Sequence, residues 1–69
     1  MSEGVFKKTE LVGTSSKSYQ DAIEKAVGRA QKTIRNLSWF EVKELRGGLH
    51  NGKIEFQAVL SLAFKLEEA

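Results

Sequence analysis

Two segments of this sequence alternate apolar and polar residues with a period of two, and this alternation constrains the fold more than any other feature. They cover residues 39–46 and 53–64, and a glycine-rich stretch, residues 47–52, separates them. A period of two is typical of β-strands, and the Asn51-Gly52 pair is typical of a tight turn between antiparallel strands. The pattern predicts a β-hairpin. The expected buried face of its second strand consists of Ile54, Phe56, Ala58, Leu60, Leu62 and Phe64.

The apolar positions also predict how the two strands pair. A two-residue turn at Asn51-Gly52 would place Phe40 and Leu62 on opposite faces of the sheet and would split the core. A three-residue connection, His50-Asn51-Gly52, pairs Leu49 with Lys53 and keeps the apolar positions together. The resulting pairs are Phe40 with Leu62, Val42 with Leu60 and Trp39 with Ala63. We therefore expect the three-residue connection.

This register assigns a second set of side chains to the face that points away from the core. On the first strand the set is Trp39, Glu41, Lys43 and Leu45, and on the second strand it includes Gln57, Val59 and Ala63. Trp39 and Gln57 share this face because side chains two residues apart in a strand point the same way, but they lie far apart along the hairpin. We expect any ligand site that uses both residues to involve more than one subunit.

The N-terminal half of the chain predicts one strand followed by one helix. Residues 5–12 are rich in β-formers and lead into residues 13–16, Gly-Thr-Ser-Ser, which favour a turn, so we expect the strand to end there. Ser18 begins an S-x-x-D capping box, which predicts a helix that ends near Asn36. Gly28 lies inside this helix, either to admit another backbone or because the position tolerates it. The apolar stripe of the helix is Ala22, Ile23, Ala26, Val27, Ala30, Ile34 and Leu37.

The size of the chain points to self-association. We expect a single domain over residues 1–69, and so short a domain needs stabilisation beyond its own core. The sequence has no cysteine for a disulfide, and its single histidine, His50, argues against a structural metal. The hairpin is also longer than the helix, since its second strand spans roughly 40 Å and a helix of about 18 residues spans about 27 Å. Oligomerisation is the remaining source of stability.

The first residues and the charge distribution argue against several classes of protein. Residues 1–4 contain no basic stretch followed by an apolar run, so we expect no secretory signal and a cytoplasmic location. The most apolar stretch, residues 58–66, is interrupted by Ser61 and Lys65 and is too short to span a membrane. The net charge is only +2, and basic residues are dispersed among acidic ones, so we do not expect a nucleic-acid partner.

No set of residues indicates catalysis. His50 is expected in the turn, where there is neither a cysteine nor a second histidine to act with it. Glu41 and Glu44 have an odd spacing, so we expect them on opposite faces of the strand, where they cannot form an acid/base pair. The glycines match no phosphate-binding loop. We therefore expect no enzyme, no catalytic residue and no metal ligand.

Trp39 and Gln57 are the candidate ligand-binding residues. A lone tryptophan is more often a packing or interface residue, but on an open sheet face its indole can stack on a flat heteroaromatic ring. Gln57 offers a donor and an acceptor to such a ring, although a lone glutamine on a sheet face is usually solvated. Arg46, beside the hairpin glycines, is the basic residue best suited to grip a phosphate.

Several short blocks resemble, in their order and spacing, the bacterial members of the dodecin family. The resemblance runs from about Val5 to Leu66, with variable positions such as Ser16 and Gly48 expected in loops. The blocks are VFKKTELVGTS at 5–15, SYQDA at 18–22, NLSWFEV at 36–42, Arg46-Gly47, Gly52-Lys53 and Phe56-Gln57.

This resemblance implies an α+β fold, β-α-β-β, in which a three-stranded antiparallel sheet of order 1-3-2 packs on one helix and partly wraps it. It also implies a hollow homododecamer whose two-fold pockets each hold a stacked pair of flavins between tryptophans. By position, Trp39 corresponds to the stacking tryptophan and Gln57 to the glutamine that bonds the ring edge. Arg46 and Lys7 correspond to phosphate contacts. Coenzyme A contacts on the outer surface would fall to Arg29, Lys32 and Lys65.

The function that the resemblance implies is storage and buffering of a flavin, with quenching of its photoexcited ring by Trp39. The presence of Arg46 favours FMN over unphosphorylated riboflavin. Two alternatives stay open: a structural cage that holds no flavin, and a small basic module that binds nucleic acid.

Overall fold

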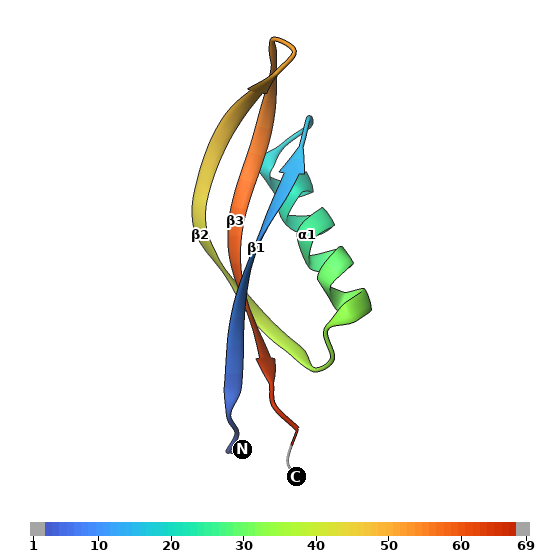
Figure 1. The fold of residues 1–69 in the computed structure, drawn as a ribbon, viewed down its shortest axis with the longest axis vertical. Helices are drawn as coiled ribbons and strands as arrows, with labels where there is room; N and C mark the ends of the chain where they lie inside the picture. Colours follow the sequence, from blue (N-terminus) through green and yellow to red (C-terminus); the bar gives the residue numbers. More distant parts are fainter. Residues whose placement is uncertain (1–2, 68–69) are drawn as a thin grey trace.

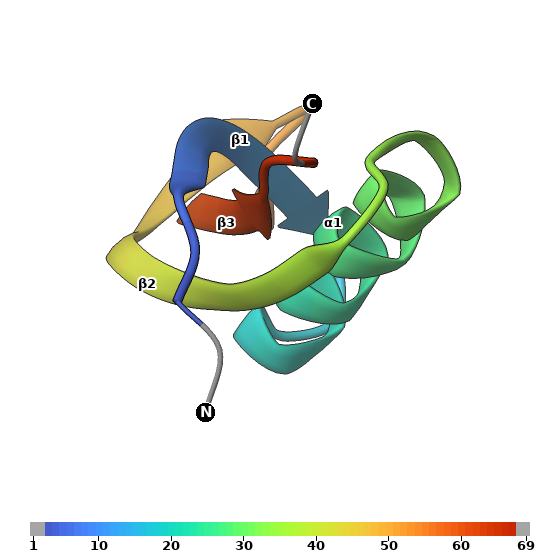
Figure 2. The ribbon, with the colours of Figure 1, turned by 90° about the horizontal axis from the view of Figure 1, so that it is seen from below.

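The fold is a three-stranded antiparallel sheet with one helix against it. The computed structural model describes residues 3–67 and contains, in chain order, β1 (Phe6–Ser15), α1 (Tyr19–Thr33), β2 (Leu37–His50) and β3 (Lys53–Lys65). β3 lies between the other two strands, so the sheet order is β1-β3-β2 and both neighbours of β3 run antiparallel to it. Figure 1 shows α1 along one side of the sheet, and Figure 2 shows how strongly the sheet curls. The predicted β-α-β-β fold and its strand order are confirmed.

The start of α1 is fixed by Ser18, the N-cap residue predicted from the sequence. The hydroxyl of Ser18 accepts a hydrogen bond from the backbone N–H of Asp21 at 3.0 Å, which satisfies one of the free donors of the first turn. The Asp21 carboxylate accepts a bond of 2.6 Å from the Ser15 hydroxyl and faces Lys25 at 3.2 Å. The pKa of Asp21 is lowered, mainly by the hydrogen bond from Ser15 and secondly by the one from Lys25. These contacts tie the end of β1 to the first turn of α1.

The end of α1 comes earlier than predicted. The helix stops at Thr33, and the N–H of Ile34 closes the last turn on the carbonyl of Ala30 at 2.8 Å. Asn36, the expected helix end, has a φ of 64° and turns the chain toward β2. A left-handed asparagine is common where a chain leaves a helix, because its short polar side chain tolerates that conformation.

The core between α1 and the sheet is built from small residues. Its fully or nearly buried apolar members are Ala22, Ala26, Ala30, Ala58, Leu60 and Leu62. The three alanines lie on one stripe of α1 and allow the helix to approach the sheet closely. This core is small for the number of apolar residues in the chain, so a large share of the apolar surface lies outside it.

Gly13 shows why the first strand is longer than predicted. β1 does not end before this glycine but continues to Ser15, with Gly13 paired to Ala58. A Cβ at Gly13 would overlap the carbonyl oxygen of Ala22 and lie 2.8 Å from the Cβ of Ala26. The glycine is therefore a point of close contact between strand and helix rather than part of a turn.

The hairpin turn differs from the prediction, although the pairing of the core residues does not. His50 pairs with Lys53 and Leu49 with Ile54, so the turn has two residues, Asn51 and Gly52. Both have positive φ, 52° and 76°, as a type I′ hairpin turn requires. The predicted Leu49–Lys53 pair is wrong, whereas the pairs Phe40–Leu62, Val42–Leu60 and Trp39–Ala63 are confirmed.

A β-bulge reconciles these pairings. The register shifts between Val42 and Glu44, where β2 uses two steps for one step of β3, and the extra residue is Lys43. Beyond the bulge the alternation of β2 is inverted, so that Leu45 pairs with the buried Ala58 on the helix side. The expectation that Leu45 lies on the open face is therefore wrong. Arg46 takes its place there, directly opposite Gln57.

The long hairpin extends past the helix and leaves apolar side chains uncovered. The chain measures 50 × 20 × 17 Å, and the tip of the hairpin projects beyond α1 (Figure 1). At that tip Leu49 is 80% exposed and Ile54 62% exposed. Exposed apolar groups of this size favour association with another surface. No helix in residues 3–67 is long and apolar enough to cross a bilayer.

The contact at Gly13 makes a prediction about stability. Gly13→Ala is expected to lower the free energy of unfolding by about 1–3 kcal/mol, because the added methyl group overlaps the backbone of Ala22. Gly28→Ala is the matched control, since a Cβ there meets no atom within 4 Å and should raise helix stability by up to about 1 kcal/mol. Urea unfolding at a single protein concentration measures both. Equal or greater stability of Gly13→Ala would contradict the close contact.

Candidate functional site

Trp39 lies on the open face of the sheet, and its indole is held in place from two directions. Trp39 is 43% exposed and lies on the same face as Phe6, whose ring centroid is 5.0 Å away at an interplanar angle of 54°. The indole N–H donates to the Glu41 carboxylate at 3.3 Å. The other oxygen of that carboxylate accepts a bond of 2.9 Å from the Lys8 ammonium. An exposed aromatic ring with a fixed orientation is suited to stacking on a flat ligand.

Glu41 links the aromatic and basic parts of this arrangement. The Lys8 hydrogen bond, followed by the one from Trp39, lowers the pKa of Glu41 below its ordinary value of 4.5. Both bonds favour the charged form because a carboxylate accepts and cannot donate. Glu41 was not among the site residues predicted from the sequence. Its position two residues from Trp39 on the same strand could have indicated that the two side chains share a face.

Gln57 forms the centre of a second cluster on the same face. Arg46, its cross-strand partner, donates from Nε to the Gln57 carbonyl oxygen at 2.7 Å. The Gln57 NH₂ group donates to the Glu55 carboxylate at 2.8 Å. Arg46 also faces Glu44, with Nη1 3.9 Å from a carboxylate oxygen. The structure therefore unites two predicted site residues, Arg46 and Gln57, and adds Glu55 to them.

The two clusters lie well apart on the same face. Trp39 pairs with Ala63, which is six residues along β3 from Gln57, so the clusters are separated by roughly 20 Å at the rise of a strand. A single flat ring cannot contact both in one subunit. The predicted separation of Trp39 and Gln57 is confirmed.

Lys7 does not join either cluster within one subunit. Its neighbours in β1, Phe6 and Lys8, contact Trp39 and Glu41 on the open face, so alternation turns Lys7 to the helix side of the sheet. It pairs with Phe64, at the opposite end of β3 from Arg46 and its partner Gln57. A shared phosphate contact of Lys7 and Arg46 would need two subunits.

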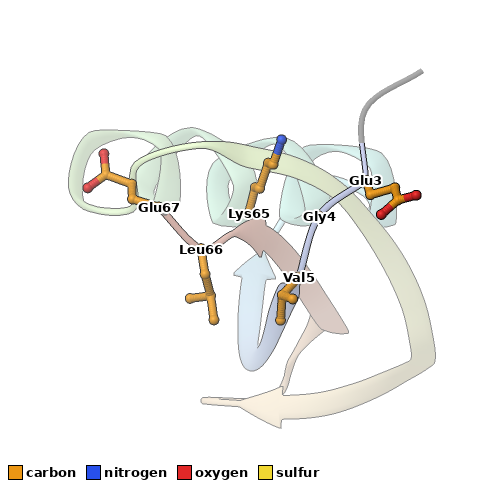
Figure 3. A pocket seen from close by; sticks show the side chains of 6 residues that line it. All are labelled: Glu3, Gly4, Val5, Lys65, Leu66 and Glu67. Atoms are coloured by element: carbon orange, nitrogen blue, oxygen red, sulfur yellow. The ribbon is translucent and has the colours of Figure 1, made fainter. Parts of the chain in front are cut away.

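The three residues predicted for coenzyme A occupy two elements. Arg29 and Lys32 are exposed on α1, one turn apart. Lys65 lies at the end of β3, where it lines a hollow of about 530 Å³ between the two ends of the described chain (Figure 3). The remaining lining residues are Glu3, Gly4, Val5, Leu66 and Glu67.

His50 and the pair Glu41 and Glu44 are placed differently from what the sequence predicted. His50 is the last residue of β2 rather than a turn residue, although it is exposed as expected. Glu41 and Glu44 lie on the same face, because the bulge at Lys43 cancels their odd spacing. Each faces a cation, Lys8 for Glu41 and Arg46 for Glu44. Within residues 3–67 no three His, Cys, Asp or Glu side chains are grouped so that they could hold a metal ion.

Comparison with known proteins identifies the family. The family model described as Dodecin matches residues 5–67. The chain belongs to the dodecin family. It is 52% identical over 65 residues to a dodecin of Thermus thermophilus, covering 93% of this chain and 94% of that protein. The resemblance noted in the sequence is confirmed.

Solved dodecin structures share the fold. The dodecin of Streptomyces coelicolor superposes with a TM-score of 0.89 at 43% identity and covers the whole of both chains. A crystal structure of a Thermus thermophilus protein gives a TM-score of 0.87 at 50% identity, over 97% of this chain and all of that one. A similar chain in an experimental structure thus adopts the same arrangement of three strands and one helix.

The pairing of Glu41 makes a prediction about pH. A carboxyl group whose pKa is lowered by folding contributes stability above its unfolded pKa, and this is lost as the pH falls through the folded pKa. We expect the fluorescence of Trp39, the only tryptophan, to change in an acidic transition below pH 4.5, as the protonated Glu41 releases Lys8 and the indole. Fluorescence recorded during an acid titration measures this transition.

Glu41→Gln should lack the transition, because the amide does not titrate, whereas Glu44→Gln should retain it. The same transition in Glu41→Gln would show that another group controls the environment of Trp39.

Proposed function

We propose that this protein binds a flavin, holds it without turning it over, and so acts as a store and buffer for FMN or a related flavin. The observation that carries the proposal is the exposed indole of Trp39, fixed by Phe6 and Glu41 on an open sheet face. A fixed and exposed indole loses little conformational freedom when a flat ring stacks on it. Membership of the dodecin family supports a flavin as that ring, because the family resemblance implies it.

The residues on the open face fit the chemistry of an isoalloxazine. Its flat ring would stack on Trp39, and its pyrimidine edge, which carries donors and acceptors, would meet Gln57. A flavin supplies a photoexcitable, redox-active ring, and close contact with indole quenches that ring by electron transfer. The two clusters are too far apart in one subunit to grip one ring, so we propose that Trp39 and Gln57 come from different subunits.

Arg46 is proposed to hold the phosphate of FMN. Its Nε is engaged by Gln57, but its guanidinium carries further N–H donors that can bind a phosphate. Lys7 would contribute from another subunit, because it lies on the other face of the sheet. Arg29, Lys32 and Lys65 remain the proposed contacts for coenzyme A on the outer surface.

Assembly is part of the proposed function. The uncovered apolar side chains of the hairpin, such as Leu49 and Ile54, support self-association. We propose the homododecamer that the family resemblance implies, in the cytoplasm, with no enzymatic activity of its own. A cage without a ligand would use the same apolar surface, so flavin binding itself has to be measured.

The stacking role of Trp39 predicts the outcome of a flavin titration. FMN added to refolded apoprotein should lose its fluorescence in a saturable manner, because the indole quenches the stacked ring. Trp39→Ala should abolish the quenching, and Gln57→Ala should weaken binding by roughly 2- to 10-fold, as expected for the loss of one or two hydrogen bonds. Undiminished FMN fluorescence with the wild-type protein would leave the structural cage as the better explanation.

The phosphate role of Arg46 predicts a change in ligand preference. Arg46→Ala should reduce the preference for FMN over riboflavin by about tenfold or more, because a hydrogen bond to a charged group is lost. The ratio of the two dissociation constants is the relevant quantity, since Arg46 also contacts Gln57 and could affect both ligands. Lys43→Ala is the control, a nearby cation at the bulge. An unchanged ratio in Arg46→Ala would exclude this role.

A further inference from the structure

The amide of Gln57 has only one orientation that satisfies its neighbours. Arg46 can only donate, so the group that faces its Nε at 2.7 Å is the carbonyl oxygen. The Glu55 carboxylate can only accept, so the group that faces it at 2.8 Å is the NH₂. Rotating the amide by half a turn would place donor against donor at Arg46 and acceptor against acceptor at Glu55. Both neighbours therefore impose the same orientation.

Gly48 provides the space that this orientation needs. It lies in β2 opposite Glu55, not in a loop as expected from the sequence. A Cβ at Gly48 would lie 2.9 Å from the Gln57 amide nitrogen and 3.6 Å from the Glu55 carboxylate oxygen. The first distance is shorter than carbon and nitrogen tolerate without a shift, and the atom that would move is the end of a flexible side chain. Any side chain at this position would displace the amide from Glu55.

We propose that Glu55 and Gly48 are positioning residues that fix the Gln57 amide and thereby select ligands by the order of donors and acceptors along their edge. This inference rests on the proposed flavin site. An amide has two acceptor lone pairs and two N–H donors, and the neighbours take one of each. One acceptor and one donor remain, in a fixed order. They match a ring edge on which an N–H stands beside a carbonyl.

The neighbouring glycine provides a matched control. Gly47 precedes Gly48 in β2 and therefore points to the other face, where it pairs with Phe56. A Cβ at Gly47 would have its nearest contact at 3.8 Å, to the backbone oxygen of Glu55, which is an ordinary distance. Gly47→Ala and Gly48→Ala thus add the same methyl group to the same strand, and only the second disturbs Gln57.

The test compares lumiflavin with 3-methyllumiflavin, which lacks the N–H of the ring edge. Neither carries a phosphate, so the phosphate contact of Arg46 is not involved. The wild-type protein should bind lumiflavin about tenfold more tightly, because the methyl group leaves polar groups of Gln57 unpaired. Glu55→Ala and Gly48→Ala should lower this ratio severalfold, because Arg46 alone then orients the amide. Glu55→Gln, which keeps an acceptor for the amide, and Gly47→Ala should preserve it.

The ratio separates positioning from a general loss of structure. Quenching by Trp39 should survive in all four variants, because the stacking residue is untouched, and size-exclusion chromatography checks their assembly. A wild-type protein that quenches neither ligand would refute the proposed function itself. A wild type that binds both ligands equally, or a ratio that persists in Glu55→Ala and Gly48→Ala, would overturn the positioning role alone. If Gly48→Ala does not fold, Glu55→Ala against Glu55→Gln decides.

Discussion

The bulge at Lys43 is the feature on which the ligand-facing surface depends. One extra residue in β2 inverts the alternation of every residue between the bulge and the turn, because side chains of a strand alternate with a period of two. It turns Leu45 toward the helix side and brings Arg46 opposite Gln57. Without it, Arg46 would point away from Gln57 and the amide would lose one of the two neighbours that orient it.

The apolar residues of the chain differ in burial. The core against α1 contains four alanines and two leucines, and Gly13 brings β1 close to the helix. Larger side chains of β2, such as Phe40 and Leu45, are about half exposed although they lie on the helix side, because α1 packs on β1 and β3 and leaves the edge strand β2 largely uncovered. Several large apolar side chains exposed on one face favour association with another surface. This distribution is consistent with the association expected from the length of the chain.

The residue pattern was sufficient to predict the elements and the core pairs, and the family resemblance implied the strand order, but neither predicted the turn. A three-residue turn in a regular strand and a two-residue turn followed by a bulge produce the same pairing of Phe40 with Leu62. The pairing of the core residues depends only on the turn length plus the number of bulge residues. The pairing therefore cannot distinguish a longer turn from a shorter turn with a bulge. The error therefore fell on the residues between turn and bulge, Leu45 among them. Gly13 was misread for a similar reason, because a glycine in a strand and a glycine in a turn look alike without the helix that packs on it.

The residues of the candidate site could be predicted from the sequence only in part. The position of Trp39 on the open face follows from alternation on one strand, whereas the contacts of Gln57 require the cross-strand register and the missing side chain of Gly48.

Because Trp39 and Gln57 lie roughly 20 Å apart, a ring that needs both must be bound by an assembly. A ligand that binds only the assembled form stabilises that form, by a free energy that grows with the logarithm of the ligand concentration above its Kd. Under the proposed function, each subunit would contribute Trp39 to one flavin site and Gln57 to another. Flavin binding and assembly would then strengthen each other.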